Sequence, residues 1–195
     1  MPAAERREQL LDVAKQLVGD QGFHGVSIEA IARRAGVTRP VVYGHFKDLD
    51  DLLEALLDRE GARALGQLAE VLPARWASAG DAREALVEGL RGYLETIKAD
   101  PVTWRLVLMP PEGAPTVLRD QVTKGREAVI AALAELVRPG LSPDNPSPDP
   151  ALTARLLSAV SDEAARLMLT DPAEYPIERL LAHTDWLLAQ LIGSP

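Results

Sequence analysis

The chain has 195 residues, 47% of them hydrophobic, and a formal net charge of −8, so it can bury a proper core in one large or two small domains. It contains no cysteine, which excludes a disulfide framework, thiolate chemistry and a zinc finger. The N-terminus lacks the apolar core of a signal peptide and no segment has ~18 unbroken apolar residues, so we expect a cytoplasmic protein without a membrane span.

Helical patterns punctuated by glycine and proline run through the whole chain. No alternation of apolar and polar residues demands a strand, so we expect an all-α fold of about nine helices. The first is an amphipathic helix at about 6–21, with Leu10, Ala14 and Leu17 on one face. It is expected to stop near Gly22.

Two short helices joined by a tight turn are predicted at 27–46, which is the outline of a helix-turn-helix. Ser27 is placed to cap the first helix, and Gly36 to end it in the left-handed conformation that glycine adopts cheaply. The second helix starts at once, with Thr38 as its expected cap and Pro40 in its first turn, where a missing amide costs little.

The spacing of the second helix also separates an inner from an outer face. Val42 and Phe46, four residues apart, face inward. The residues left on the outer side are Arg39, Val41, Tyr43 and His45. Two helices of this size cannot bury their own apolar faces, so the unit needs the helix before it and the helix that Asp48 can cap after it.

Formal charge is unevenly distributed along the chain. Residues 1–47 carry +2 and the remainder carries −10. A net negative charge alone argues against a nucleic-acid binder, but the positive end is the helix-turn-helix end.

Four sequence features fall in register between Glu8 and Leu53: the pair Gly22-Phe23, Ser-Ile-x-x-Ile-Ala, Ala-Gly-Val-Thr at the turn, and Tyr-x-His-Phe. Together they resemble the DNA-binding domain of the TetR family of bacterial transcriptional regulators, over about the first quarter of the chain. The resemblance implies a DNA-binding domain at 1–47 and a helical ligand-binding and dimerisation domain at 48–195, linked by the helix that starts at 48.

The resemblance and the outward-facing positions together predict the DNA-binding residues. These are Ser27, Thr38, Arg39, Pro40, Val41, Tyr43, His45 and Lys47. Arg39 is suited to a bidentate contact with guanine and Val41 to a thymine methyl, while the family motif implies backbone contacts for Tyr43 and His45. The alternatives are that Arg39 is a solvated charge and that His45 packs under Phe46.

One position departs from the family pattern. Members usually carry a phosphate-contacting lysine in the turn before the fourth helix, where this chain has Leu49 among Asp48, Asp50 and Asp51. Carboxylates at a helix start favour the helix dipole but repel a phosphate. Either Lys47 and free amides take over the contact, or DNA binding is weaker than usual.

Six further helices are predicted after the turn at 48. They are expected at 48–72 (ended by Pro73), 81–99, 101–109, 115–138, 151–169 and 176–192, with a proline-rich loop at 139–150. The last two helices are more apolar than one packing face requires, and the first of them is rich in alanine and serine. We interpret them as a homodimer interface that forms a four-helix bundle, the alternative being ordinary core.

The resemblance also implies an unknown, largely apolar small-molecule effector within the C-terminal helices. The residues expected to line its pocket are Tyr93, Trp104, Arg105, Met109, Arg126 and Met168. Aromatic and methionine side chains at helical spacing are also ordinary core residues.

The overall prediction is a regulator, most simply a repressor, that binds a palindromic DNA operator as a homodimer and is released by its effector. An alternative is a helical interaction module with a degenerate DNA-binding half, suggested by Leu49 and its aspartates. A small enzyme is the remaining alternative, but the three histidines form no HExxH pair and there is no glycine-rich phosphate loop. We therefore expect no catalytic residue, no metal site and no cofactor.

Overall fold

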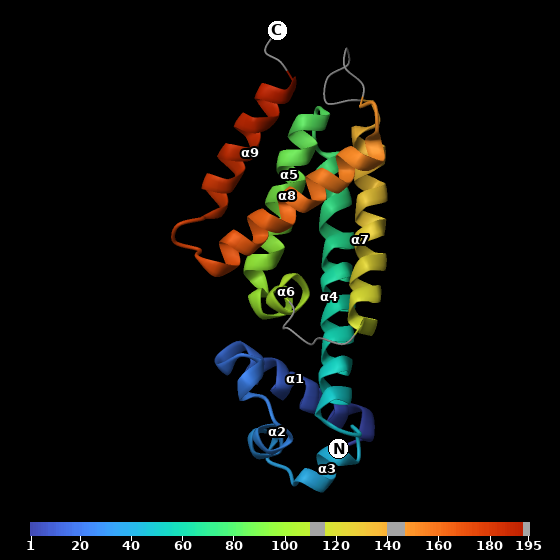
Figure 1. Cartoon of the computed structure of the whole chain (residues 1–195), viewed down its shortest axis with the longest axis vertical. Helices are drawn as coiled ribbons and strands as arrows, with labels where there is room; N and C mark the ends of the chain where they lie inside the picture. The colour runs from blue at the N-terminus through green and yellow to red at the C-terminus, as the bar shows by residue number, and fades with distance from the viewer. Residues whose placement is uncertain (110–115, 140–146, 193–195) are drawn as a thin grey trace. The chain divides into compact units, whose positions relative to one another are not determined.

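The computed structural model describes residues 1–109, 116–139 and 147–192 of the chain (Figure 1). This part of the chain is helical throughout, without strands, which confirms the expected all-α fold. The helices are α1 (Ala3–Gln21), η1, a 3-10 turn (Phe23–Gly25), α2 (Ile28–Ala35), α3 (Arg39–Tyr43), α4 (Leu49–Ala77), α5 (Ala82–Ala99), α6 (Pro101–Leu108), α7 (Thr116–Val137), α8 (Pro150–Thr170) and α9 (Ile177–Ile192).

The chain divides into two compact units. One combines Met1–Arg63 with Val102–Gln121, and the other combines Ala64–Pro101 with Val122–Pro195. Helix α4 therefore contributes its first part to the first unit and its second part to the other. The domain boundary predicted at residue 47 stays a prediction.

The first unit is built on the apolar stripe of α1. Its core contains Leu10, Leu11, Val13, Ala14, Leu17, Val26, Ile31, Ala32, Val42, Phe46, Leu52 and Leu56, drawn from α1 to α4. The helix-turn-helix contributes only a few of these side chains, so α2 and α3 depend on α1 and α4 for burial, as their short lengths predict. The guanidinium of Arg7 in α1 also lies over the Phe46 ring, 4.8 Å from its centroid.

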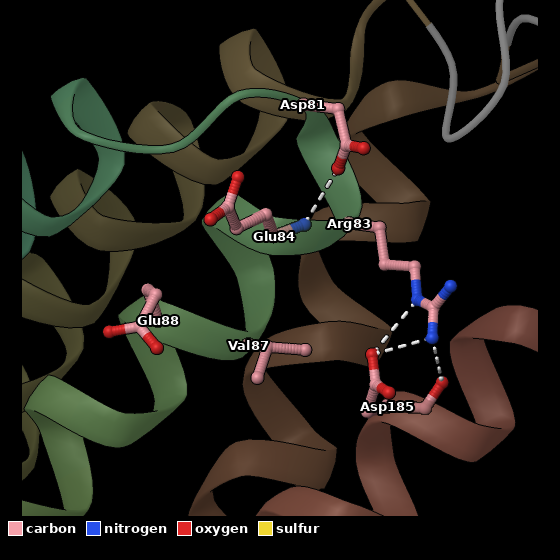
Figure 2. A pocket seen from close by; sticks show the side chains of 6 residues that line it. All are labelled: Asp81, Arg83, Glu84, Val87, Glu88 and Asp185. Atoms are coloured by element: carbon pink, nitrogen blue, oxygen red, sulfur yellow. Dashed lines mark hydrogen bonds and ion pairs between the residues drawn. The ribbon is translucent and has the colours of Figure 1, made fainter.

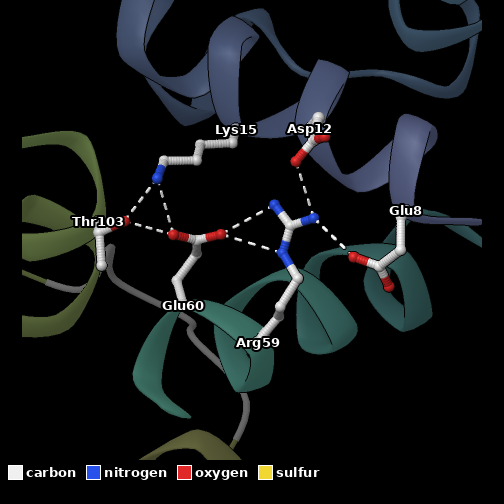
Figure 3. Close-up of polar contacts among 6 residues, drawn as sticks. All are labelled: Glu8, Asp12, Lys15, Arg59, Glu60 and Thr103. Carbon is white, nitrogen blue, oxygen red and sulfur yellow. Dashed lines mark hydrogen bonds and ion pairs between the residues drawn. The ribbon is translucent and has the colours of Figure 1, made fainter. Parts of the chain in front are cut away.

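A buried carboxylate adds polar contacts to this unit (Figure 3). Glu60 of α4 has no exposed surface, and its oxygens lie 2.9 Å from Lys15 Nζ in α1 and 2.8 Å from an Arg59 nitrogen. The hydroxyl of Thr103 in α6 also donates to Glu60. Arg59 then reaches α1 at Glu8 and Asp12, over 3.0 and 2.9 Å. These ion pairs tie α1 to α4.

The second unit packs α5 against both α8 and α9. Its buried apolar side chains include Leu86, Leu90, Leu94, Ile97, Ile130, Val137, Ala165, Leu169, Leu181 and Leu188. The end of α4 lies very close to α5, because a Cβ on Gly89 would stand 2.4 Å from Trp76 Nε1. Asp81 and Asp149 cap α5 and α8 as predicted, accepting from backbone amides at 2.8 and 3.0 Å.

The prediction that Pro73 ends the fourth helix is wrong. Helix α4 continues through Pro73 to Ala77. A proline inside a helix removes one hydrogen bond and costs about 3 kcal/mol, so tertiary contacts must hold the last turn. Arg75 provides two of them, pairing with Glu88 at 3.1 Å and Glu95 at 2.6 Å on α5.

Most of the proline-rich loop predicted at 139–150 lies outside the described residues. Among the helices that the structure describes, none combines the length and the apolar character needed to cross a bilayer.

Candidate nucleic-acid interface

The turn between α2 and α3 is set by local sequence. Ser27 is extended, and its hydroxyl accepts a hydrogen bond from Ala30 N at 3.1 Å, which confirms the predicted cap. Gly36 has φ 68° and ψ 32°, the left-handed conformation that favours glycine, and a Cβ there would meet nothing within 4 Å. The need for glycine at Gly36 is therefore conformational. Val37 N then donates to Ala32 O at 2.9 Å and closes the end of α2.

Thr38 stands at the cap position of α3 with an extended backbone, but its hydroxyl makes no capping hydrogen bond. The reason lies in the residues that follow. Pro40 has no amide proton, and Val41 N already donates to the Thr38 carbonyl at 3.0 Å. The Thr38 side chain is exposed, so its hydroxyl stays available for a partner outside the chain.

Helix α3 presents its outer face as the spacing predicts. Val42 is fully buried in the first unit, whereas Val41 and Tyr43 are exposed, at 37% and 54%. Thr38, Arg39, Pro40 and Lys47 are also exposed, and Ser27 lies exposed at the start of α2. His45 is half-buried. The predicted DNA-binding residues are thus exposed, apart from the half-buried His45, and we refer to this exposed segment from the start of α2 to Lys47 as the polar edge.

The start of α4 bears on the two substitutes predicted for the missing family lysine. Asp48 Oδ1 accepts from Asp51 N at 2.9 Å, and Asp51 Oδ2 accepts from Lys47 N at 2.8 Å. Two of the amides that could have met a phosphate are therefore used by the protein itself. Leu49 is half-buried and packs against the core. Of the two predicted substitutes for the missing lysine, the side chain of Lys47 remains.

The residues predicted to line the effector pocket are divided between the two units. Tyr93, Arg126 and Met168 belong to the second unit, whereas Trp104, Arg105 and Met109 belong to the first. Trp104 is buried, and Arg105 and Met109 are exposed.

Within the second unit, Asp162 of α8 brings Tyr93 and Arg126 together. The Tyr93 hydroxyl donates to Asp162 Oδ1 at 2.8 Å, and Arg126 donates to the other carboxylate oxygen. Burial raises the pKa of Tyr93 well above its ordinary value of 10.0, and the neighbouring carboxylate of Asp162 raises it further. Asp162 is buried and was missed as a site residue, although it falls on the inward stripe of Ser158 and Ala165.

A surface hollow of about 270 Å³ also lies in the second unit, lined by Asp81, Arg83, Glu84, Val87, Glu88 and Asp185 (Figure 2). It contains none of the predicted effector residues. Its polar groups already have partners: Arg83 pairs with Asp185 at 2.8 Å, Glu84 accepts from Gly80 N at 2.6 Å, and Asp81 caps α5. The hollow therefore offers few unsatisfied groups to a ligand.

The last two helices carry apolar side chains that no contact within the unit covers. On α8, Leu152, Leu156 and Val160 are exposed at i, i+4 and i+8, which makes one stripe. On α9, Trp186 and Leu187 are exposed. The small residues Ser158, Ala164 and Ala165 are instead buried within their own unit, so close approach by a partner cannot rest on them.

The chain is similar in sequence and in fold to known bacterial transcriptional regulators. Residues 10–56 match the family model described as bacterial regulatory proteins, tetR family. The transcriptional activator FasR of Mycolicibacterium smegmatis is 29% identical over 137 residues, which cover 70% of this chain and only 61% of FasR. A TetR-like transcriptional regulator from Rhodococcus sp. RHA1 superposes over the whole of both chains with 25% identity and a TM-score of 0.72.

A further solved structure shares the fold alone. The transcriptional regulator FadR from Bacillus subtilis, crystallised in complex with stearoyl-CoA, is 18% identical, with a TM-score of 0.69 over 95% of this chain and 99% of FadR.

The capped turn and the exposed α3 on a supporting pair of helices define a DNA-binding helix-turn-helix regulator. More specifically, residues 10–56 match the tetR family of bacterial regulatory proteins, and the chain as a whole is similar to a TetR-like transcriptional regulator. The matched proteins are regulators by name, which confirms the expectation that the chain is not an enzyme.

Proposed function

We propose that the protein binds a palindromic operator as a homodimer and that a small, largely apolar effector releases it. The observation that carries the proposal is the outer face of α3, where exposed Arg39, Val41 and Tyr43 follow the turn at Gly36. A recognition helix of this kind enters the major groove with its first residues at the base edges. Because its DNA target lies there, the same proposal places the protein in the cytoplasm.

Base and backbone contacts divide along this edge. Arg39 is the residue that can make a bidentate contact with guanine, and Val41 can contact a thymine methyl. Thr38, Tyr43 and Lys47 offer hydroxyl and ammonium groups to the phosphates, which set register without reading sequence.

The dimer is proposed to form through the apolar stripe of α8 and the exposed end of α9. Leu152, Leu156 and Val160 make a self-complementary surface when two copies meet about a two-fold axis. Trp186 of α9 widens it, and His183 stacks on the Trp186 ring at 5.4 Å between centroids. A second copy of the chain suits this surface because two such helix pairs give a four-helix bundle.

The effector is proposed to bind in the second unit beside Tyr93, Arg126 and Asp162. Their cluster places a polar anchor among the apolar side chains of α5 and α8, the composition of a small-molecule site. FadR, which shares the fold, was crystallised with stearoyl-CoA, and this supports an effector with a long apolar part. In the simplest case the protein represses by occupying the operator, and release by the effector ends the repression.

The decisive experiment is selection of bound fragments from bulk genomic DNA, followed by fluorescence anisotropy on the selected duplex. A regulator should prefer an inverted repeat, bind as two copies, and lose affinity steeply as salt increases. A helical interaction module without DNA function, suggested by the aspartates around Leu49, would show neither a selected sequence nor a salt slope.

A further inference from the structure

The arginine best suited to base contact is already paired within the protein. Arg39 of α3 and Glu29 of α2 form an ion pair with 2.9 Å between Arg39 NH2 and Glu29 Oε2. Both side chains are largely exposed, at 58% and 64%, so neither is needed for the core. The pair lies on the same polar edge that the proposed function gives to DNA.

We infer that Glu29 is a specificity-determining residue, which acts on DNA recognition through Arg39 by competing with phosphates for its guanidinium. The inference rests on the proposed function and adds a residue that neither the family motif nor the spacing of α3 assigns to DNA recognition.

The competition follows from the charges. In a non-specific complex, Arg39 gains mainly from phosphate oxygens, and it must either leave Glu29 or bring that carboxylate close to the DNA backbone. Both choices cost binding free energy. Non-specific affinity is therefore lower than the exposed arginine alone would give.

A correct base contact offsets this cost. A guanidinium has five N–H donors, and a bidentate contact with guanine O6 and N7 uses two of them. The pair with Glu29 occupies one terminal nitrogen, NH2. Glu29 can remain in place and hold the guanidinium in one orientation, so the carboxylate penalises wrong sites more than the right one.

The test compares wild type with Glu29→Gln on the duplex selected from genomic DNA and on a scrambled duplex of equal length, by fluorescence anisotropy at two salt concentrations. Glu70→Gln is the matched control, because Glu70 is exposed in the α4 part of the other unit and its change alters net charge equally. Arg39→Ala and the double variant Arg39→Ala/Glu29→Gln complete a cycle.

Glu29→Gln should bind the scrambled duplex about two- to fivefold more tightly than Glu70→Gln does, the range that one exposed ion pair supports. Binding to the selected duplex should change less, so the specificity ratio falls and base preference weakens at one position per half-site. In the Arg39→Ala background, the Glu29 change should no longer alter the ratio.

Two results overturn the inference but not the proposed function. In the first, the wild type prefers the selected duplex and Glu29→Gln has the same ratio of affinities for the selected and scrambled duplexes. In the second, Glu29→Gln still changes that ratio in the Arg39→Ala background. A wild type that binds the selected and scrambled duplexes equally overturns the proposed function as well.

Discussion

Replacing Glu60 by glutamine should destabilise the first unit more than its small change in shape suggests. The carboxylate is completely buried, and it accepts from Lys15, Arg59 and Thr103. Glutamine keeps the size and one acceptor oxygen but removes the negative charge. Lys15 and Arg59 are then left close together with less to balance them.

The expected loss in free energy of unfolding depends on how much solvation and how many ion pairs Lys15 and Arg59 keep. Removing one partner of a buried ion pair usually costs about 3–5 kcal/mol, because the other charge stays buried. Here Lys15 and Arg59 have 16% and 21% of their side chains exposed, so water can solvate them in part. Arg59 also keeps Glu8 and Asp12. We therefore expect a loss of about 2–3 kcal/mol.

Urea unfolding at pH 7, followed by circular dichroism, measures this loss, and hydrogen exchange of α1 shows whether it is localised there. Glu135→Gln is the matched control, since Glu135 also pairs with an arginine, Arg138, but on the exposed surface of α7. Its unfolding midpoint should stay at the wild-type value.

The pH dependence of the stability difference between wild type and Glu60→Gln is an independent check. Burial alone would raise the pKa of Glu60, but hydrogen bonds from Thr103 and Lys15 outweigh it and hold the pKa below its ordinary value of 4.5. A carboxylate with a depressed pKa stabilises the folded state above the unfolded pKa and loses that contribution as pH falls through the folded value. The gap between wild type and Glu60→Gln should therefore be constant near neutrality and shrink below about pH 4.5. Equal stability at pH 7, or a gap unchanged in acid, would refute the ionic interpretation.

Three other substitutions test the proposed sites. Arg39→Ala should cost on the order of 1–3 kcal/mol on the selected operator and relax one base pair per half-site; an unchanged operator profile removes Arg39 from base readout. Leu156→Glu should convert the homodimer to monomer in sedimentation velocity by placing charge in the apolar stripe of α8, and a persistent dimer would move the interface elsewhere. Tyr93→Phe should lower stability by about 1–3 kcal/mol, because Asp162 loses a buried donor, and should weaken effector-induced release from DNA; unaltered release would separate Tyr93 from the effector site.

Local signals in the sequence were sufficient for most of the first unit. The caps at Ser27 and Asp48 and the left-handed Gly36 involve residues within a few positions of one another, so their roles can be recognised from spacing alone. Thr38 occupies the predicted cap position, but its hydroxyl makes no capping hydrogen bond, because Pro40 has no amide proton and Val41 N donates to the Thr38 carbonyl. Pro40 itself can be read from the sequence, but the hydrogen bond from Val41 N depends on backbone geometry.

Contacts between distant residues could not be predicted in the same way. Tyr93 and Asp162 are 69 positions apart and Glu60 and Thr103 are 43 apart, so nothing in one sequence pairs them. The wrong end assigned to α4 at Pro73 has the same origin, since Arg75 reaches α5 over more than a dozen positions.

Under the proposed function, the intramolecular ion pairs also bear on how so acidic a chain would discriminate among DNA sequences. Its net charge of −8 opposes approach to any duplex, and several cations of the first unit are held by carboxylates, including Arg34 by Asp20 at 2.8 Å and Arg39 by Glu29. Electrostatic attraction to the phosphates contributes to the binding free energy on every DNA sequence. Reducing it lowers affinity everywhere but leaves base contacts intact, so a larger fraction of the remaining binding free energy depends on sequence. On this reasoning, the aspartates around Leu49 act in the same direction as Glu29 and favour selectivity over affinity.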